Sequence, residues 1–188
     1  RNIHQKGYIL KTQANPGFLE IVEGSIFDHK LIEKLFTNAD LCVNLIGILF
    51  EKGKNNFNNI HVEFPKMISR YASTYKLEKF VHISALGIEN AKDSIYAQSK
   101  LKGEKEVLNN FHKAVIVRPS IVYSVDDNFT TQLMTLLGLM PIFPIYYNGK
   151  TKFRPIHCSD LTNSITKIII DDIKENIIEF AGPEEMSF

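Results

Sequence analysis

Tyr96 and Lys100 are the residues whose types and spacing are suited to chemistry. They lie four positions apart in Tyr96-Ala-Gln-Ser-Lys100, so a helix places the phenol and the ammonium on one face about one turn apart. A nearby ammonium favours the phenolate and lowers the pKa of a tyrosine from its usual value of about 10. The same ammonium can hold ribose hydroxyls. Helical spacing alone favours a surface tyrosine beside a solvated lysine, and only the surrounding elements reverse that interpretation.

Strands and helices alternate along the chain. Almost continuously apolar segments are typical of parallel strands that are covered on both faces. The strand-helix alternation predicts βαβ crossovers and a doubly wound parallel sheet. The predicted strands cover residues 18–22, 40–49, 79–84, 114–118 and 177–180; the predicted helices cover residues 29–36 after an Asp28 cap, a stretch with Val62 to Tyr71 on one face, a segment begun by Ser94, residues 130–139, and a segment from Ser159 or Asp160 to about residue 172.

Ligands of such a sheet bind outside the carboxyl ends of its strands, so the residues that follow each strand are candidate contacts. We expect these segments to converge on one edge of the sheet. They are Ser25-Ile26, Leu45-Ile46-Gly47, Ser84-Ala85-Leu86 and Pro119-Ser120-Ile121-Val122.

Composition excludes several classes of protein. The chain has 188 residues, a hydrophobic content of 44% and a net charge of +1, as expected of an ordinary globular domain without a nucleic-acid-binding basic face. Its six histidines and two cysteines do not pair at metal-ligand spacing, so we expect no metal site. Residues 133–147, the longest apolar run, contain Gly138, Pro141 and Pro144 and are too short to span a bilayer, which needs about 20 residues.

Several segments in a set order resemble the extended short-chain dehydrogenase/reductase superfamily, which includes NAD-dependent epimerases and dehydratases. The resemblance implies a Rossmann-like fold with a small C-terminal substrate lobe. It implies that Tyr96 is the acid/base, that Lys100 binds the nicotinamide ribose, and that the turn Arg118-Pro119-Ser120 closes over the nicotinamide end. The segments are Asn44-Leu-Ile-Gly47, Tyr96 to Lys100, residues 115–123, residues 153–160 and Ala181-Gly-Pro183.

The chain departs from that superfamily at three places. The opening strand and its Gly-rich phosphate loop, roughly thirty residues of a first βα unit, are absent from the chain, which looks cut at its start. Arg1 then falls at the end of the second strand, where an arginine can pair with the 2′-phosphate of NADP. Ala85 occupies the place of the catalytic serine or threonine, and Ser84 can replace it only from an irregular strand end, because neighbouring strand side chains point to opposite faces. Ser25 stands where many relatives carry an adenine-contacting aspartate.

A closer resemblance is to the atypical branch that contains the Rossmann-type accessory subunit of respiratory complex I and its bacterial relatives. It rests on residues 43–51, Ile60-His-Val-Glu63, residues 81–87 and residues 111–119. That branch keeps the fold and the nucleotide but has an altered catalytic set. The resemblance implies NADP(H), with NAD(H) as the alternative, and a structural or assembly role or slow oxidoreduction. It also implies a peripheral protein of the bacterial cytoplasm or the inner side of a respiratory membrane, which is the matrix in mitochondria.

Other interpretations stay open at this level. The chain could be an active epimerase, dehydratase or reductase that uses Tyr96, or an interaction module. We predict a partial dinucleotide-binding domain over residues 1–122 and a mixed segment of substrate lobe and returning Rossmann elements over residues 123–188. Residues 129–147 are apolar enough to pack the lobe or to meet a hydrophobic molecule or membrane complex. His61 and Glu63 do not face each other on a helix, so we expect them to be solvated or capping residues and not an acid/base pair. His82 is expected to be a packed imidazole.

Overall fold

The computed structural model describes residues 7–125, 127, 135 and 151–187. Packing separates the chain into two compact units, Arg1–Asn38 and Ala39–Phe188. The proposed division at residue 122 follows functional lobes and stays a prediction. The predicted helix over residues 130–139 and the apolar stretch 129–147 lie outside the described residues, apart from Thr135.

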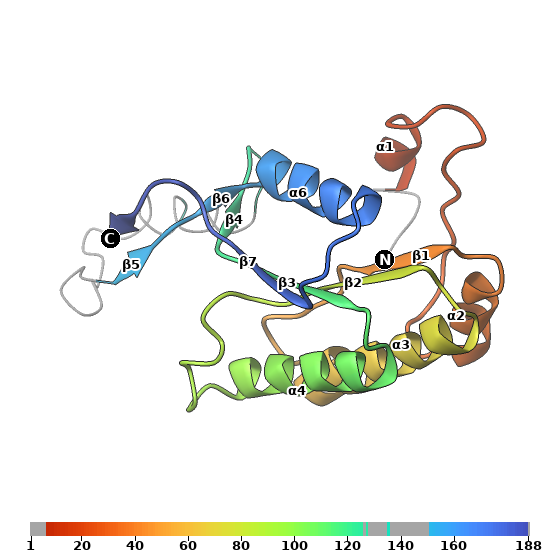
Figure 1. Cartoon of the computed structure of the whole chain (residues 1–188), viewed down its shortest axis with the longest axis horizontal. Helices are drawn as coiled ribbons and strands as arrows, with labels where there is room; N and C mark the ends of the chain where they lie inside the picture. The colour runs from red at the N-terminus through yellow and green to blue at the C-terminus, as the bar shows by residue number, and fades with distance from the viewer. Residues whose placement is uncertain (1–6, 126, 128–134, 136–150, 188) are drawn as a thin grey trace. The chain divides into compact units, whose positions relative to one another are not determined.

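A four-stranded parallel sheet forms the centre of the unit Ala39–Phe188 (Figure 1). Its strand order is β1 (Leu41–Asn44), β2 (Lys79–Ile83), β3 (Val115–Pro119) and β7 (Ile177–Phe180). Every neighbouring pair is parallel, and the register sets Asn44 opposite His82. The predicted parallel α/β fold is therefore confirmed.

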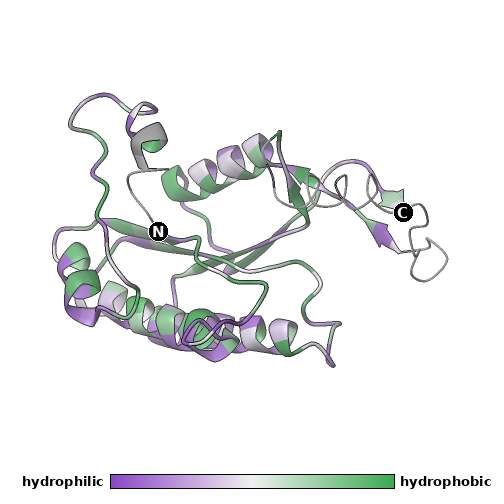
Figure 2. Cartoon of the chain, turned by 180° about the vertical axis from the view of Figure 1, so that it is seen from behind, coloured by the Kyte–Doolittle hydropathy of each residue, from purple (hydrophilic) through white to green (hydrophobic). Residues whose placement is uncertain are grey.

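Helices cover both faces of this sheet. On one face lie η2 (Asn58–Glu63), α3 (Phe64–Thr74) and α4 (Ile95–Asn110), and on the other lies α6 (Cys158–Ile170) (Figure 1). Ser94 caps α4 by accepting a hydrogen bond from the Ala97 amide, as its sequence position predicts. Figure 2 shows hydrophobic residues along the strands, while the helices carry both kinds. The apolar core under α6 contains Val81, Val115, Val117, Ile156, Leu161 and Ile168.

Two short strand pairs follow β3. One is β4 (Val122–Tyr123) with β6 (Ile156–His157), which is parallel, and the other is β5 (Lys152–Phe153) with β8 (Met186–Ser187), which is antiparallel. Helix α6 begins one residue before the predicted Ser159 cap. The cap is His157 instead, because its Nδ1 accepts the Ser159 amide.

The unit Arg1–Asn38 contains α1 (Tyr8–Lys11) and α2 (His29–Phe36). Asp28 caps α2 by accepting from the Leu31 amide at 3.1 Å, as predicted. The strand predicted over residues 18–22 is not formed, and Phe18 is 85% exposed. A strand needs hydrogen bonds to a neighbour, and no described strand pairs with this segment, so β-prone residues alone do not make it one.

Candidate functional site

The carboxyl ends of β1, β2 and β3 bring several predicted contacts to one edge of the sheet. Leu45, Ile46 and Gly47 follow β1, and Leu45 is 70% exposed. Pro119 ends β3, Ser120 follows it and donates its amide to Phe180, and Val122 opens β4. The structure thus groups these residues as predicted. Ser25 and Ile26 belong to the unit Arg1–Asn38, and Arg1 lies outside the described residues, so their roles stay predictions.

Lys100 points from α4 to this edge. Its side chain is buried, and its Nζ donates to the Ile83 carbonyl at the end of β2 over 3.0 Å. A Cβ built at Gly47 would lie 3.5 Å from Lys100 Nζ, so the glycine leaves the ammonium reachable from the loop after β1. Burial lowers the pKa of Lys100 to about 8, and Glu104 one turn further along α4 opposes that shift.

Tyr96 does not have the lowered pKa that its spacing from Lys100 suggests. Burial raises the pKa of its phenol, because an apolar surrounding disfavours the phenolate. The Lys100 ammonium is engaged by the Ile83 carbonyl. The expectation of a lowered pKa is therefore wrong for this structure, and Tyr96 keeps its proton at neutral pH.

Whether Ser84 replaces the hydroxyl that Ala85 lacks stays a prediction. Ladder hydrogen bonds continue past β2, since the Ser84 amide donates to Val117 and the Leu86 amide to Pro119. This regular extension keeps the side chains of residues 84 and 85 on opposite faces. Ser84 Oγ is buried and has no hydrogen-bond partner in the part of the chain that the structure describes.

Two histidines that the sequence did not assign to the site lie beside it. His61 is stacked on Phe57 and meets Tyr96 edge to face, with ring centroids 5.3 Å apart in both pairs. His82 is buried on β2, and its Nδ1 accepts from Asn44 Nδ2 at 2.9 Å. His82 is thus the packed imidazole predicted. The expectation of a solvated or capping His61 is wrong, because its side chain is 1% exposed. Its apolar neighbours Ile60 and Val62 were the only signal of burial in the sequence.

Both imidazoles are neutral at pH 7. Burial, with the Lys100 charge nearby, lowers the pKa of His61 to about 4 and that of His82 to about 3. A backbone amide can only donate, so the Ile48 N–H places the lone pair of His61 on Nε2. Likewise, the Asn44 amide group places the lone pair of His82 on Nδ1, since Asn44 Oδ1 accepts the Ile46 amide.

We expect acid to destabilise the protein through these histidines. The unfolded state takes up a proton near pH 6.5 and folded His61 only near pH 4, so the free energy of unfolding falls as the pH drops between these values. Each histidine contributes a slope of at most about 1.4 kcal/mol per pH unit. Denaturant unfolding between pH 4.5 and 6.5 checks this, and the slope should be shallower in His61→Gln. An equal slope in that variant would contradict the prediction.

Arg118 forms ion pairs with three carboxylates. It lies buried on β3, and its Nε and Nη2 donate to the two oxygens of Glu104 at 3.0 and 2.7 Å. Glu89 and Glu179 complete the cluster at 2.8 and 3.3 Å. These carboxylates raise the pKa of the guanidinium, chiefly because Glu104 accepts two of its hydrogen bonds. In the arginine-proline turn, therefore, Arg118 ties α4 and β7 to β3, and Pro119 and Ser120 are left as candidate ligand contacts.

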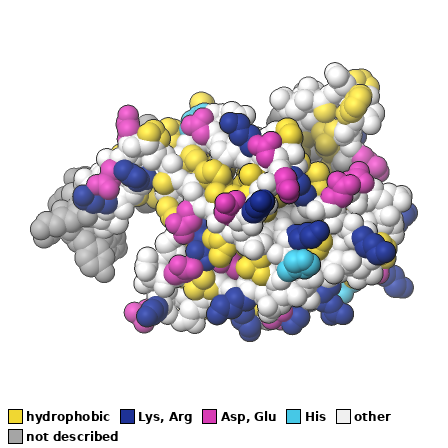
Figure 3. Space-filling view, viewed as in Figure 1, with side chains coloured by type: hydrophobic (Ala, Val, Ile, Leu, Met, Phe, Trp, Pro, Cys, Tyr) yellow, Lys and Arg dark blue, Asp and Glu magenta, His cyan; other side chains and the backbone are white. Residues whose placement is uncertain are grey.

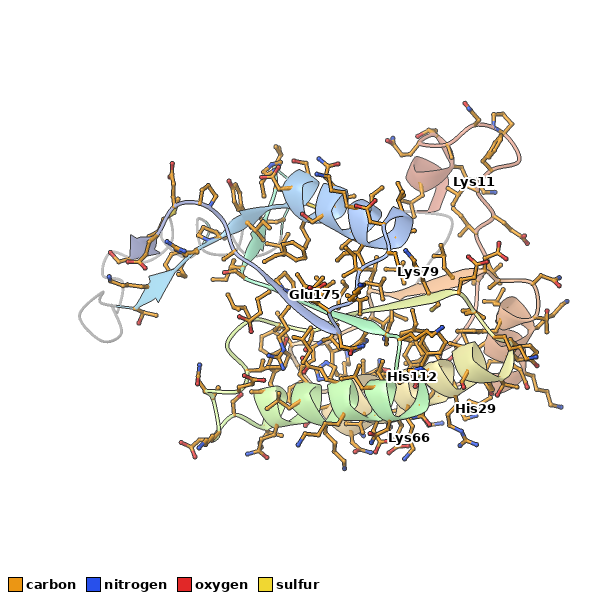
Figure 4. The ribbon with its side chains drawn as sticks, in the orientation of Figure 1. Lys11, His29, Lys66, Lys79, His112 and Glu175 are labelled. Carbon is orange, nitrogen blue, oxygen red and sulfur yellow. The ribbon has the colours of Figure 1, made fainter. Side chains whose placement is uncertain are left out.

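A cavity of about 380 Å³ lies at the other edge of the sheet, at the amino ends of β2 and β3. Lys79, His112 and Glu175, labelled in Figure 4, are among its lining residues. Lys79 Nζ donates to the carbonyls of Ile168, Ile169 and Asp171 at the end of α6, which is a structural cap. This cavity is therefore separate from the Tyr96 and Lys100 edge.

On the face drawn in Figure 3, lysines and arginines are interspersed with acidic residues. Across the described ranges, no group of histidine, cysteine, aspartate and glutamate side chains is placed to hold a metal ion. No helix among those residues is long and apolar enough to cross a membrane.

The sheet and its helices define a Rossmann-like fold. A UDP-glucuronic acid 4-epimerase from Bacillus cereus, solved with UDP-glucuronic acid and NAD, aligns with a TM-score of 0.73 at 21% identity over 96% of this chain and 65% of its own. A dTDP-4-dehydrorhamnose reductase from Bacillus anthracis, solved with NADP, aligns with a TM-score of 0.74 at 16% identity over 96% of this chain and 72% of its own. At these identities the likeness establishes the fold.

The relatives found by sequence include subunits of respiratory complex I. The mouse mitochondrial NADH dehydrogenase (ubiquinone) 1 alpha subcomplex subunit 9 is 27% identical over 93% of this chain and 46% of its own length. A ceramide reductase of Caulobacter vibrioides is 25% identical over 76% of this chain and 44% of its own length. The chain thus spans about half the length of the curated relatives it matches. No family model matches it. The predicted resemblance to extended short-chain dehydrogenase/reductases and to the complex I subunit is confirmed.

Proposed function

We propose that the protein binds a nicotinamide dinucleotide, NADPH in preference to NADH, and serves as a peripheral structural or assembly component of a complex I-type respiratory enzyme. The observation that carries the proposal is the buried Lys100 ammonium, held beside Gly47 at the carboxyl edge of a parallel sheet. This edge is where ligands of open α/β sheets bind. The complex I subunits among the relatives support the assembly role.

The chain offers a contact for each part of the ligand that reaches this edge. Leu45, Ile46 and Gly47 present an exposed apolar loop to the dinucleotide. Lys100 donates to the nicotinamide ribose hydroxyls, and Pro119, Ser120 and Val122 border the nicotinamide end. From the sequence alone, we also propose Ser25 and Ile26 as contacts of the adenosine half and Arg1 as a partner of the 2′-phosphate of NADPH. When bound, the dinucleotide supplies hydride chemistry.

Binding without fast turnover fits the residues around Tyr96. Ala85 cannot hydrogen-bond a substrate oxygen, so the usual hydroxyl is missing at that position. Burial holds the pKa of Tyr96 above its usual value, which makes the phenol a poor base at neutral pH. We place the protein on the inner side of a respiratory membrane, in the bacterial cytoplasm or the mitochondrial matrix.

Fluorescence titration of the full-length protein with NADPH tests this function. We expect saturable binding, and a loss of about tenfold or more in affinity for Lys100→Met, because a charge-assisted hydrogen bond contributes about 1.5–3 kcal/mol. Lys102→Met is the matched control, since Lys102 is an exposed lysine of the same helix. Absence of saturable binding to the unaltered protein, or equal losses in the two variants, would refute the proposal.

A second candidate function is reduction of a hydrophobic ketone. The similarity to a ceramide reductase favours it, as does the retention of both Tyr96 and Lys100. In this case Tyr96 would donate its proton to the carbonyl oxygen, and a reduced dinucleotide held by Lys100 would supply the hydride. NADPH oxidation with long-chain ketones separates the two functions. Turnover that Tyr96→Phe abolishes supports the reductase, and no turnover supports the binding role.

A further inference from the structure

His61 lies between the loop that follows β1 and the helix that carries Tyr96 and Lys100. Its side chain is almost fully buried, at 1% exposure. Its Nε2 accepts the Ile48 amide at 3.1 Å, and its Nδ1 lies 2.9 Å from Ser99 Oγ. One imidazole therefore contacts both the loop and α4.

Hydrogen bonds link Ile48, His61, Ser99 and Tyr96 in series, and the partners of His61 determine their directions. Because Nε2 accepts from Ile48, the proton of the neutral ring is on Nδ1 and is donated to Ser99 Oγ. The Ser99 hydroxyl donates in turn to the Tyr96 carbonyl at 2.7 Å. This series of hydrogen bonds runs from the Ile48 amide through the His61 imidazole and the Ser99 hydroxyl to the Tyr96 carbonyl. In each bond one group donates and the other accepts.

The backbone holds this ring in place. His61 belongs to η2, a six-residue π-helical segment, and such segments frequently occur at functional sites. The His61 carbonyl packs directly on α4 at Gly103, where an added Cβ would lie only 1.8 Å from the carbonyl oxygen. The anchored backbone and the Ser99 contact together orient Nε2 toward the loop.

The ring is also close to the proposed ligand contacts. A Cβ at Gly47 would lie 3.8 Å from His61 Nε2 and 3.5 Å from Lys100 Nζ. The imidazole and the ammonium thus approach the same glycine of the loop. Holding Ile48 through its amide therefore sets the position of Gly47 relative to Lys100.

We propose that His61 is a positioning residue that holds the loop of residues 45–48 against α4, so that the loop and Lys100 meet the dinucleotide in a preformed arrangement. The proposal rests on the proposed function, because its consequence for the ligand is dinucleotide affinity. Preformed contacts improve affinity because the loop need not be ordered at the moment of binding.

Two substitutions at the same position separate positioning from general stability. His61→Gln can place an amide oxygen near Nε2 and keep the Ile48 bond, whereas His61→Asn can place an amide nitrogen near Nδ1 and keep only the Ser99 bond. Each variant loses one hydrogen bond of the ring, so a purely structural role would affect the two alike. We expect NADPH affinity to fall about tenfold in His61→Asn and to stay within about threefold in His61→Gln, since a net hydrogen bond contributes about 1 kcal/mol and loop ordering adds to it.

Amide hydrogen exchange at Ile48 gives a readout that needs no ligand. Exchange should accelerate in His61→Asn and stay near the rate of the unaltered protein in His61→Gln. If His61→Asn does not fold, Ile48→Pro removes the same N–H from the loop side and should show the same loss of affinity. Equal affinities and equal Ile48 exchange in the two His61 variants would overturn the proposal. Failure of the unaltered protein to bind NADPH would refute the proposed function instead, and Ile48 exchange would still test the positioning role.

Discussion

Arg118→Met is expected to lower the free energy of unfolding by about 3–5 kcal/mol, because it leaves the Glu104 carboxylate buried without its partner. Glu104 is 3% exposed and binds the guanidinium through both oxygens. The same arginine also joins Glu89 before α4 and Glu179 on β7, so its loss loosens the sheet edge near the candidate site. Denaturant unfolding followed by circular dichroism measures the effect.

The double variant Arg118→Met with Glu104→Leu is the control for this prediction. Replacing a buried ion pair by apolar side chains of similar volume is often neutral, so the double variant should recover most of the lost stability. The partly exposed pair of Lys66, labelled in Figure 4, and Glu106 gives a second control. Lys66→Ala should cost less than about 1 kcal/mol. A cost of that size for Arg118→Met would show that the buried cluster contributes little.

Gly103→Ala is expected to destabilise the protein by about 2 kcal/mol or more, although alanine normally stabilises a helix by about 1 kcal/mol relative to glycine. The added Cβ would lie 1.8 Å from the His61 carbonyl oxygen and 3.0 Å from its carbonyl carbon. Both atoms belong to backbone, so α4 and η2 must move apart. The separation would also pull the Tyr96 and Lys100 helix away from His61. We therefore expect NADPH affinity to fall together with the thermal midpoint.

Gly87→Ala is the matched control for Gly103→Ala. Gly87 has a φ of +77° and no heavy atom within 4 Å of a built Cβ, so its substitution tests backbone strain without a clash. Strain in the left-handed region costs about 1–2 kcal/mol. NADPH affinity should not change in this variant, since α4 keeps its place. A Gly103→Ala variant as stable as the unaltered protein would contradict the close contact between α4 and η2.

The arrangement of these contacts explains why the candidate site lies where it does. Glu104 is one turn beyond Lys100, and the hydrogen bond that Arg118 donates to Glu104 holds α4 against β3. Gly103 lets the same helix approach His61. Lys100 is thus positioned by neighbours on both sides of it, the ion pair with the sheet and the close contact with η2.

Local features of the sequence were sufficient for much of the fold. Apolar runs at residues 40–49, 79–84 and 114–118 predicted buried parallel strands, although the first strand ends at Asn44 and not at residue 49. The capping side chains of Asp28 and Ser94 predicted where two helices begin. Helical spacing placed Tyr96 and Lys100 on one face. These predictions held because each depends on residues within a few positions of one another.

The chemical state of the site depended on tertiary structure. Whether Lys100 lowers the pKa of Tyr96 depends on burial of the phenol and on the Ile83 carbonyl, which lies 17 positions before Lys100 and accepts a hydrogen bond from its ammonium. Arg118 could be assigned to the ligand only while its partner Glu104 was unknown, and His61 gained a role only when Ile48 and Ser99 met its ring. Residues 18–22 have strand propensity, yet a strand also requires a hydrogen-bonding neighbour. Spacing along the chain determines which side chains share a face, but charge, protonation and pairing depend on groups that only folding brings together.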